Sequence, residues 1–215
     1  MHARYHGVMA DVAARTRRVP APKLTAKGRA TRARIVEAAS VECRVRGASL
    51  TTLDHIIEST QTSKSQLFHY FPGGKEQLFL EVARFEADRV IEDQQPFLDN
   101  LTSWQAWRDW RDCVVARYRS QGYLCPMAGL IAEVGRTTPG AQAISRELFV
   151  KWRAAIVAGI SSMQELGEIS PSVDADRAGA ALLAGIQGGV GVLMSTGDLS
   201  YLEAALDEGI VALHR

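Results

Sequence analysis

The chain has 215 residues, 47% of them hydrophobic and 23% charged, so it is long enough to fold around a core and too apolar to be disordered throughout. The net charge of +1 hides an asymmetry, because residues 1–75 carry 13 Lys and Arg against 5 Asp and Glu, whereas residues 76–215 carry 12 against 19. Three cysteines without CxxC spacing and a first segment without an apolar run give no support to a disulfide framework, a metal site or a secretory signal. We expect a cytoplasmic protein whose basic first third meets a polyanion.

Helical periodicity runs through almost all of the sequence, and the alternating pattern of strands is absent. We therefore predict an all-α fold of about nine helices. Their expected ranges, in chain order, are about 26–46, 51–59, 63–70, 75–95, 103–121, 127–135, 141–166, 174–195 and 200–213. Pro20 and Pro22 precede the first range, which predicts a flexible basic arm over residues 1–24. This arm either contacts the polyanion or only solubilises the chain, and the sequence leaves both readings open.

Polar patterns mark several of these helix starts. Thr51 is expected to cap the second helix by accepting from the N–H of Asp54. Ser63 and Gln66 form the S-x-x-Q capping box of the third helix, and the residues from Thr102 to Gln105 show a similar pattern. The second and third helices are short and are joined by a polar turn at 59–62, so they form a candidate helix-turn-helix.

The third range has the two faces that a recognition helix requires. Leu67, Tyr70 and Phe71 are expected to pack inward against the apolar side of the second helix, Leu53, Ile56 and Ile57. The residues expected to face outward are Ser63, Lys64, Ser65, Gln66 and His69. Such side chains hydrogen-bond to base edges and phosphates in a major groove. The alternative, a surface hairpin of helices without a partner, is disfavoured by the positive charge of the segment.

The segment resembles the DNA-binding domain of the TetR family of transcriptional repressors. The resemblance rests on Glu58-x4-Ser63-Lys64-x2-Leu67-Phe68-His69-Tyr70-Phe71, followed by Lys75-Glu76-x-Leu78, and on the preceding Ile35-Val36-x-Ala38-Ala39. It covers about residues 31–82. The stretch 71–76 and, more loosely, Cys125-Pro126-Met127 with Ala132-Glu133 are similar to the drug-responsive subgroup typified by LmrA and YxaF.

By that resemblance, one set of residues is expected to bind DNA: Thr51, Thr52, Ser63, Lys64, Ser65, Gln66, Phe68, His69, Tyr70 and Lys75. Three departures from the family pattern affect this set. Phe68 stands where the family has a phosphate-binding tyrosine, and Gln61-Thr62 replaces the Gly-Val of the turn, where a positive φ favours glycine. Glu42-Cys43 replaces a Leu-Phe core pair, which predicts a smaller core at this junction.

The stretch 178–197 has no charged residue and contains several glycines, among them Gly185 and Gly189. A buried helix of a soluble protein is favoured over a membrane span, because the stretch is only weakly apolar and has no aromatic belt or basic flank. The final range carries Leu202, Leu206, Ile210 and Leu213 at helical spacing. These last two helices are expected either to pair with a twofold copy as a four-helix bundle or to pack within one chain. We favour a homodimer, because one recognition helix reads few bases.

Aromatic residues are frequent in the middle of the chain. Trp104, Trp107 and Trp110 are spaced by three residues, so they share a slowly drifting helical face, which is typical of core packing. The resemblance implies a cavity for a small hydrophobic effector in this region, with Cys113 or Gln187 as a polar partner. The residues expected to line it are Phe85, Trp107, Trp110, Val114, Tyr118, Met127, Ile131, Trp152 and Gln187.

The sequence therefore predicts three parts: a flexible arm at 1–24, a helix-turn-helix DNA-binding domain at 25–76, and a helical ligand-binding and dimerisation domain at 77–215. The expected function is repression of transcription from a pseudo-palindromic double-stranded DNA operator, with release by the effector and location at the cytoplasmic nucleoid. Catalytic motifs such as GxSxG, HExxH or a P-loop are absent, so no enzyme activity, cofactor or metal is expected. The alternative is a helical dimerisation protein of the same fold with weak or no specific DNA binding.

Overall fold

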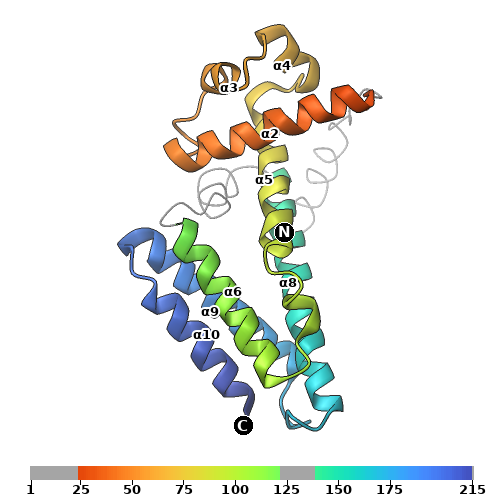
Figure 1. The fold of residues 1–215 in the computed structure, drawn as a ribbon, viewed down its shortest axis with the longest axis vertical. Helices are drawn as coiled ribbons and strands as arrows, with labels where there is room; N and C mark the ends of the chain where they lie inside the picture. The colour runs from red at the N-terminus through yellow and green to blue at the C-terminus, as the bar shows by residue number, and fades with distance from the viewer. Residues whose placement is uncertain (1–23, 122–138, 215) are drawn as a thin grey trace, which may run out of the picture. The chain divides into compact units, whose positions relative to one another are not determined.

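The computed structural model describes residues 24–121 and 139–214, and these residues form α-helices, two short 3₁₀-helices and no strand (Figure 1). The chain divides after Arg32 into two compact units, each of which we describe by itself. The all-α fold expected from the sequence is confirmed. The arm, the helix expected at 127–135 and Cys125 lie outside the described residues.

The helices follow the predicted order, with ends that differ by only a few residues. They are α2 (Ala26–Arg46), α3 (Leu53–Thr60), α4 (Lys64–Tyr70), α5 (Gly74–Glu92), η1 (Leu98–Asn100), α6 (Trp104–Gln121), α8 (Pro139–Glu165), α9 (Ala175–Thr196), α10 (Ser200–Val211) and η3 (Ala212–His214). In the first unit, Thr25 caps α2, because its Oγ1 accepts from the N–H of Gly28 at 3.1 Å.

The predicted caps are correct at one helix and shifted by one residue at two others. Ser63 forms the expected box with Gln66, with both hydrogen bonds at 3.1 Å. The cap of α3, however, is Thr52, whose Oγ1 accepts from the N–H of His55, while the buried Thr51 donates to the carbonyl of Gly47 at 2.8 Å. The prediction for Thr51 was therefore wrong, because the helix starts two residues later. At α6, Ser103 rather than Thr102 accepts from the N–H of Ala106.

The turn between α3 and α4 adopts a backbone conformation with positive φ, which its sequence, without a glycine, does not favour. Gln61 ends α3 with φ 52° and ψ 32°, the left-handed conformation expected from the position of the usual glycine. Thr62, in place of the usual valine, is buried, and its hydroxyl lies 2.6 Å from that of Thr60. The Thr60 hydroxyl also donates to the carbonyl of Ile56 at 2.6 Å, so this buried polar pair is satisfied locally.

A shared core joins α2, α3, α4 and the start of α5. Ile35, Ile56, Leu67, Phe71 and Leu78 are fully buried, each from a helix or turn of this segment. Burying such side chains supplies most of the stabilisation of helices as short as α3 and α4, which are marginal alone. The smaller Cys43 is buried in the same core, as expected from its position.

The helix α5 carries one buried row along its length. Leu78, Val82, Glu86 and Val90 follow each other at i, i+4 spacing, and all are buried. The carboxylate of Glu86 accepts from the hydroxyl of Ser40 and lies 3.6 Å from Arg44 Nη2, both on α2. Further along the chain, α5 packs against α8 (Figure 1). The same helix therefore belongs both to the helix-turn-helix core and to the helices that follow.

The helix α9 packs against both α8 and α10, and α6 lies against α10 (Figure 1). Gly189 permits the closest approach, because a Cβ there would lie 2.6 Å from the Cα of Leu202 on α10. The row Leu202, Leu206, Ile210 and Leu213 is buried within this chain. These side chains therefore pack within one chain, which is one of the two arrangements expected for them, and pairing of the two helices with a second copy through their other faces stays a prediction.

Among the described helices, α9 alone is long and apolar enough to cross a membrane by length and composition. This is weak evidence for a span, because a core helix of a soluble protein has the same properties. In α9, Leu182, Ile186 and Leu193 are buried against the rest of the chain. The structure thus gives these apolar side chains a place inside the protein, as the sequence analysis favoured.

The left-handed Gln61 leads to a stability prediction. Replacing it with glycine removes a backbone penalty of about 1–2 kcal/mol, from which the greater freedom of glycine in the unfolded chain subtracts about 0.4–1 kcal/mol. We expect Gln61→Gly to raise the free energy of unfolding by about 0.5–1 kcal/mol, measured by urea denaturation followed by far-UV circular dichroism. The same change at the exposed mid-helix Ser65 should lower it by about 0.5 kcal/mol. Equal losses in both variants would show that Gln61 is not strained.

Candidate nucleic-acid interface

The first two turns of α4 present polar side chains to solvent. Lys64, Ser65, Gln66 and His69 are exposed, and so is Ser63, which caps the helix. Leu67 is fully buried and Tyr70 is half-buried, so the two faces of α4 are divided as the sequence predicted. A short helix that is anchored underneath and polar on its outer face has the form needed to enter a major groove.

The capping box leaves donors on this outer face. Gln66 accepts from the N–H of Ser63 through its Oε1, so its amide NH₂ remains for another acceptor. The Ser63 hydroxyl accepts from the N–H of Gln66 and keeps its own proton for donation. The cap therefore fixes both side chains near the start of α4 without using their donors, and a fixed donor loses less entropy when it binds.

Phe68 and the rings beside it form the less polar part of the face. Phe68 is 39% exposed, and a Cβ at Gly74 would lie 3.6 Å from its Cε1, so the ring lies beside the start of α5. Tyr70 meets His69 edge to face, with ring centroids 5.0 Å apart. An exposed phenyl ring cannot accept or donate a hydrogen bond to phosphate, so Phe68 contributes only apolar contact here.

The remaining predicted DNA contacts occupy different surroundings. Lys75, in the first turn of α5, places its Nζ 4.9 Å from the centroid of the Phe79 ring. Thr52 is exposed and caps α3. Thr51 is buried with its hydroxyl donated to Gly47, so its side chain supports the turn and offers no exposed donor.

The predicted effector-binding aromatics lie in the core. Trp107 and Trp110 meet edge to face with centroids 5.7 Å apart, and Trp110 Nε1 donates to the buried Gln94 at 2.8 Å. The indole N–H groups of Trp107 and Trp152 are buried without an acceptor among the described residues. Val114 and Tyr118 are buried beside them in sequence, Phe85 is half-buried, and Met127 and Ile131 lie outside the described residues.

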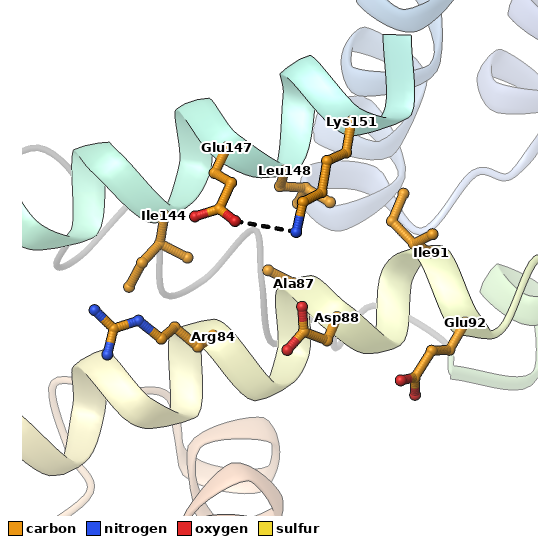
Figure 2. A pocket seen from close by; sticks show the side chains of 9 residues that line it. All are labelled: Arg84, Ala87, Asp88, Ile91, Glu92, Ile144, Glu147, Leu148 and Lys151. Atoms are coloured by element: carbon orange, nitrogen blue, oxygen red, sulfur yellow. Dashed lines mark ion pairs between the residues drawn. The ribbon is translucent and has the colours of Figure 1, made fainter. Parts of the chain in front are cut away.

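Gln187 belongs to a different surface. It lines a groove of about 730 Å³ between α8 and α9, together with apolar side chains that include Phe149, Val157 and Leu183. A second groove, of about 490 Å³, lies between α5 and α8. Figure 2 shows Arg84, Asp88 and Glu92 on α5 and the ion pair of Glu147 with Lys151, 3.0 Å long, on α8. The charges that line this second groove make it a poor match for a wholly apolar ligand.

Two buried polar residues were not predicted from the sequence. Glu86 and Gln94 are both buried, yet each is an ordinary polar residue in a helix-rich segment. A signal for Glu86 was present, because it continues the i, i+4 row of Leu78, Val82 and Val90. No comparable signal marks Gln94, which follows the end of α5 and is identified only by its contact with Trp110.

Two sequence families match the chain. Residues 35–82 match "Bacterial regulatory proteins, tetR family", and residues 103–208 match "Tetracyclin repressor-like, C-terminal domain". An HTH-type transcriptional regulator of Mycobacterium tuberculosis is 27% identical over 113 residues, which are 48% of this chain. The chain thus spans about half the length of that regulator, 53%.

Solved structures share the fold. A TetR transcriptional regulator from Chloroflexus aurantiacus is 25% identical with a TM-score of 0.72, over 89% of this chain and 98% of that one. SmeT, the repressor of the Stenotrophomonas maltophilia multidrug efflux pump SmeDEF, is 17% identical with a TM-score of 0.65, over 86% and 91%. At that identity the likeness to SmeT concerns the fold alone.

The contribution of the α4 capping box can be tested by measuring the free energy of unfolding of two variants. Ser63→Ala removes the acceptor for the N–H of Gln66, so we expect the free energy of unfolding to fall by about 1 kcal/mol. The matched variant Ser65→Ala, at an exposed position two residues further along the chain, should change it by less than about 0.5 kcal/mol. Urea denaturation of both variants measures the difference. Equal effects would mean that Ser63 does not stabilise the helix start.

Proposed function

Because the chain belongs to the tetR family of bacterial regulatory proteins, we propose that it is a ligand-responsive repressor that binds a pseudo-palindromic DNA operator as a homodimer. The family consists of helix-turn-helix DNA-binding regulators and not of enzymes. A small hydrophobic effector releases the protein from its operator. As a DNA-bound regulator it acts in the cytoplasm, at the nucleoid.

One observation carries the DNA-binding part of the proposal: the exposed, capped start of α4. Lys64, Ser65 and Gln66 stand on one exposed turn of a helix whose other face is buried. In the proposed complex this turn enters the major groove, where Gln66 and the serines donate to base edges or phosphates. Lys64 and Lys75 add phosphate contacts, and Phe68 adds apolar contact in place of the tyrosine hydroxyl.

We assign the DNA-binding domain to residues 25–76, with Thr52, Ser63, His69 and Tyr70 as further proposed DNA contacts. We assign the ligand-binding and dimerisation domain to residues 77–215. We propose that the chain is similar to the LmrA and YxaF subgroup within the family, which the pattern at 71–76 supports. In the arm, basic residues add backbone or minor-groove contacts. The single α5 helix, which belongs to both regions, is the element through which they influence one another.

The dimer is proposed to form through the exposed sides of α9 and α10. Exposed small residues follow each other along α9 at helical spacing: Ala181, Ala184, Gly188, Gly191 and Ser195. A Cβ at Gly188 or at Gly191 would meet no atom of the described residues within 4 Å, apart from the neighbouring backbone of α9 itself. A mid-helix glycine costs about 1 kcal/mol relative to alanine, and the fold of one chain gives no reason for these two. Close approach of a partner helix supplies that reason.

The effector is proposed to bind in the body near Trp107 and Trp152, with Trp110, Val114 and Tyr118 around it and with Phe85, Met127 and Ile131 as further contacts. Gln187, which lines the separate groove between α8 and α9, is not part of this proposed site. Two buried indole N–H groups without an acceptor favour a ligand that carries an oxygen or nitrogen acceptor on an apolar frame. The effector binds best when the two recognition helices no longer match successive grooves, so DNA and effector oppose each other through one equilibrium.

The DNA-binding proposal predicts a specific effect of two exposed side chains. Lys64→Ala combined with Gln66→Glu removes a positive charge, adds a negative one and removes the amide donor, but it keeps a side-chain oxygen that can accept from the N–H of Ser63. We expect this double variant to bind DNA at least tenfold more weakly than the wild type and to lower the slope of log K against log salt by about one. The measurement is fluorescence anisotropy with the intergenic DNA beside the gene.

The control is Lys151→Ala, which removes an exposed lysine from α8 and should leave DNA affinity unchanged. Absence of specific, salt-sensitive binding by the wild type would refute the repressor. Wild-type binding that the double variant retains in full would favour the alternative, a dimerisation protein of the same fold that uses no specific contacts from α4.

The dimer proposal predicts that two glycine substitutions separate association from folding. Gly188→Ala with Gly191→Ala adds methyl groups that meet nothing within one chain, so folding is preserved or slightly favoured. In the dimer these methyl groups meet the partner helix, so we expect at least tenfold weaker association by sedimentation velocity. The control Gly185→Ala places its Cβ 3.5 Å from Ala205 inside the chain and should leave association unchanged. A double variant with the wild-type dimer constant would rule out this face.

A further inference from the structure

A pocket of about 620 Å³ lies where α2, α5 and α6 meet. Its charged and polar lining consists of Arg44 from α2, Arg89 from α5, Asp93 at the end of α5, and Cys113, Arg117, Ser120 and Gln121 from α6. Three arginines therefore face one aspartate, and the pocket is of the size that small molecules occupy. Of the residues expected above to meet DNA or the effector, only Cys113, a candidate polar partner of the effector, lines it.

The donors of this pocket are only partly used by the protein. The side chain of Arg117 is 8% exposed, and its Nη1 donates to the carboxylate of Asp93 and to the carbonyl of Arg89. Its Nε–H is buried and meets no acceptor among the described residues. The Nε–H of Arg44 is likewise buried and meets no acceptor among the described residues. The Oε1 of Gln121 is buried and meets no donor among them.

Buried N–H groups of arginine are costly to leave without an acceptor, because the charge has lost its hydration. The two nearby carboxylates, those of Asp93 and Glu86, do not accept hydrogen bonds from these Nε–H groups. Asp93 already binds Arg117 through Nη1, and Glu86 lies 3.6 Å from Arg44 Nη2, beyond hydrogen-bond distance. Among the described residues, no ion-pair network engages these donors, so the arrangement fits an acceptor supplied by a bound molecule.

We propose that this pocket binds the anionic group, a carboxylate or a phosphate, of a small molecule. Its oxygens accept from the Nε–H groups of Arg44 and Arg117, and the guanidinium of Arg89 adds a third positive charge. The remainder of the molecule lies against the Cys113 side of the pocket. This site is independent of the DNA-binding proposal, because it rests only on groups within one chain.

Simple probes test the site. Benzoate and phenyl phosphate carry the two anionic groups, and benzamide is the neutral control of the same shape. At constant ionic strength, we expect either anion to raise the Tm of the full chain while benzamide does not. Arg89→Gln keeps the backbone carbonyl that accepts from Arg117 and should weaken anion binding at least tenfold. The control Arg84→Gln removes a charge from the same helix but from the other groove.

A Tm rise with only one of the two anions identifies the group that the pocket prefers and supports the site. Equal shifts with benzamide, or equal loss in Arg84→Gln and Arg89→Gln, would overturn it, because both results describe a nonspecific effect. A variant that unfolds is replaced by Arg89→Lys, which keeps the charge but has no planar fork, and which should bind both anions more weakly.

Cys113 provides a second readout inside the pocket. Burial raises the pKa of its thiol, the positive charge of Arg117 acts against this, and Asp93 adds to it. A raised pKa keeps the thiol neutral at pH 7, so alkylation by iodoacetamide becomes fast only at higher pH. We expect benzoate to slow alkylation of Cys113 at pH 9 several-fold in the wild type and not in Arg89→Gln. Unchanged rates in the wild type would contradict occupancy of the pocket.

The place of Arg44 on α2 gives this site a regulatory consequence, which rests on the proposed function. An anion that binds Arg44 competes with Glu86 for it, so the contact between α2 and α5 changes. We expect saturating benzoate or phenyl phosphate to change DNA affinity at least threefold in the wild type and not in Arg89→Gln. Anion binding without any change in DNA affinity would overturn the coupling alone, whereas absence of wild-type DNA binding would count against the repressor and not against the pocket.

Discussion

The buried carboxylate of Glu86 constrains how the helix-turn-helix joins the helices that follow. It is almost fully buried, and the partners that it meets, Ser40 and Arg44, stand on α2. A buried charge without partners is strongly destabilising, so α2 can move along α5 only by breaking this contact or by replacing it. Glu86 also lies in the row that continues into the core of the body. The geometry of this contact therefore determines which positions of α2 and α5 are stable.

This constraint gives α5 a defined role in any response to a ligand. Its first half shares the core of α3 and α4 through Leu78, and its second half packs against α8. A helix that is packed at both ends moves as one body, because well-packed interiors change between discrete arrangements and do not deform freely. A ligand that favours one arrangement in the body thereby favours one position of the recognition helix, provided that its affinity differs between the arrangements.

The sequence was sufficient for the fold and for the faces of α4, because both depend on local periodicity. It placed Leu67 inward and Lys64, Ser65 and Gln66 outward, as the structure has them. It was less accurate for the helix caps, where a shift of one residue decides whether the prediction is correct. Thr51 and Thr52 are equally good caps by composition, and only the start of α3 at Leu53 selects between them.

Local sequence patterns did not predict the contacts between residues that are far apart in the sequence. The row from Leu202 to Leu213 has the spacing of an interface helix, and whether its partner is α9 of the same chain or a second chain is not encoded in that spacing. Gly189 and Gly188 are adjacent glycines with opposite meanings: one is required by Leu202, and the other meets nothing. The DNA and effector contacts remain predictions for the same reason, because they depend on molecules that the sequence does not describe.

Arg44 is shared by two competing interactions, the contact with Glu86 and the proposed anion site. It lies near Glu86, which holds α2 against α5, and it lines the pocket at the end of α5. A guanidinium has one charge to share, so stronger binding of an anion weakens its attraction to Glu86, and the reverse holds equally. Couplings of this kind are typically about 1–3 kcal/mol, which corresponds to roughly 5-fold to 150-fold in affinity. That range is enough to move a repressor from a mostly bound to a mostly free state without any large rearrangement of its core.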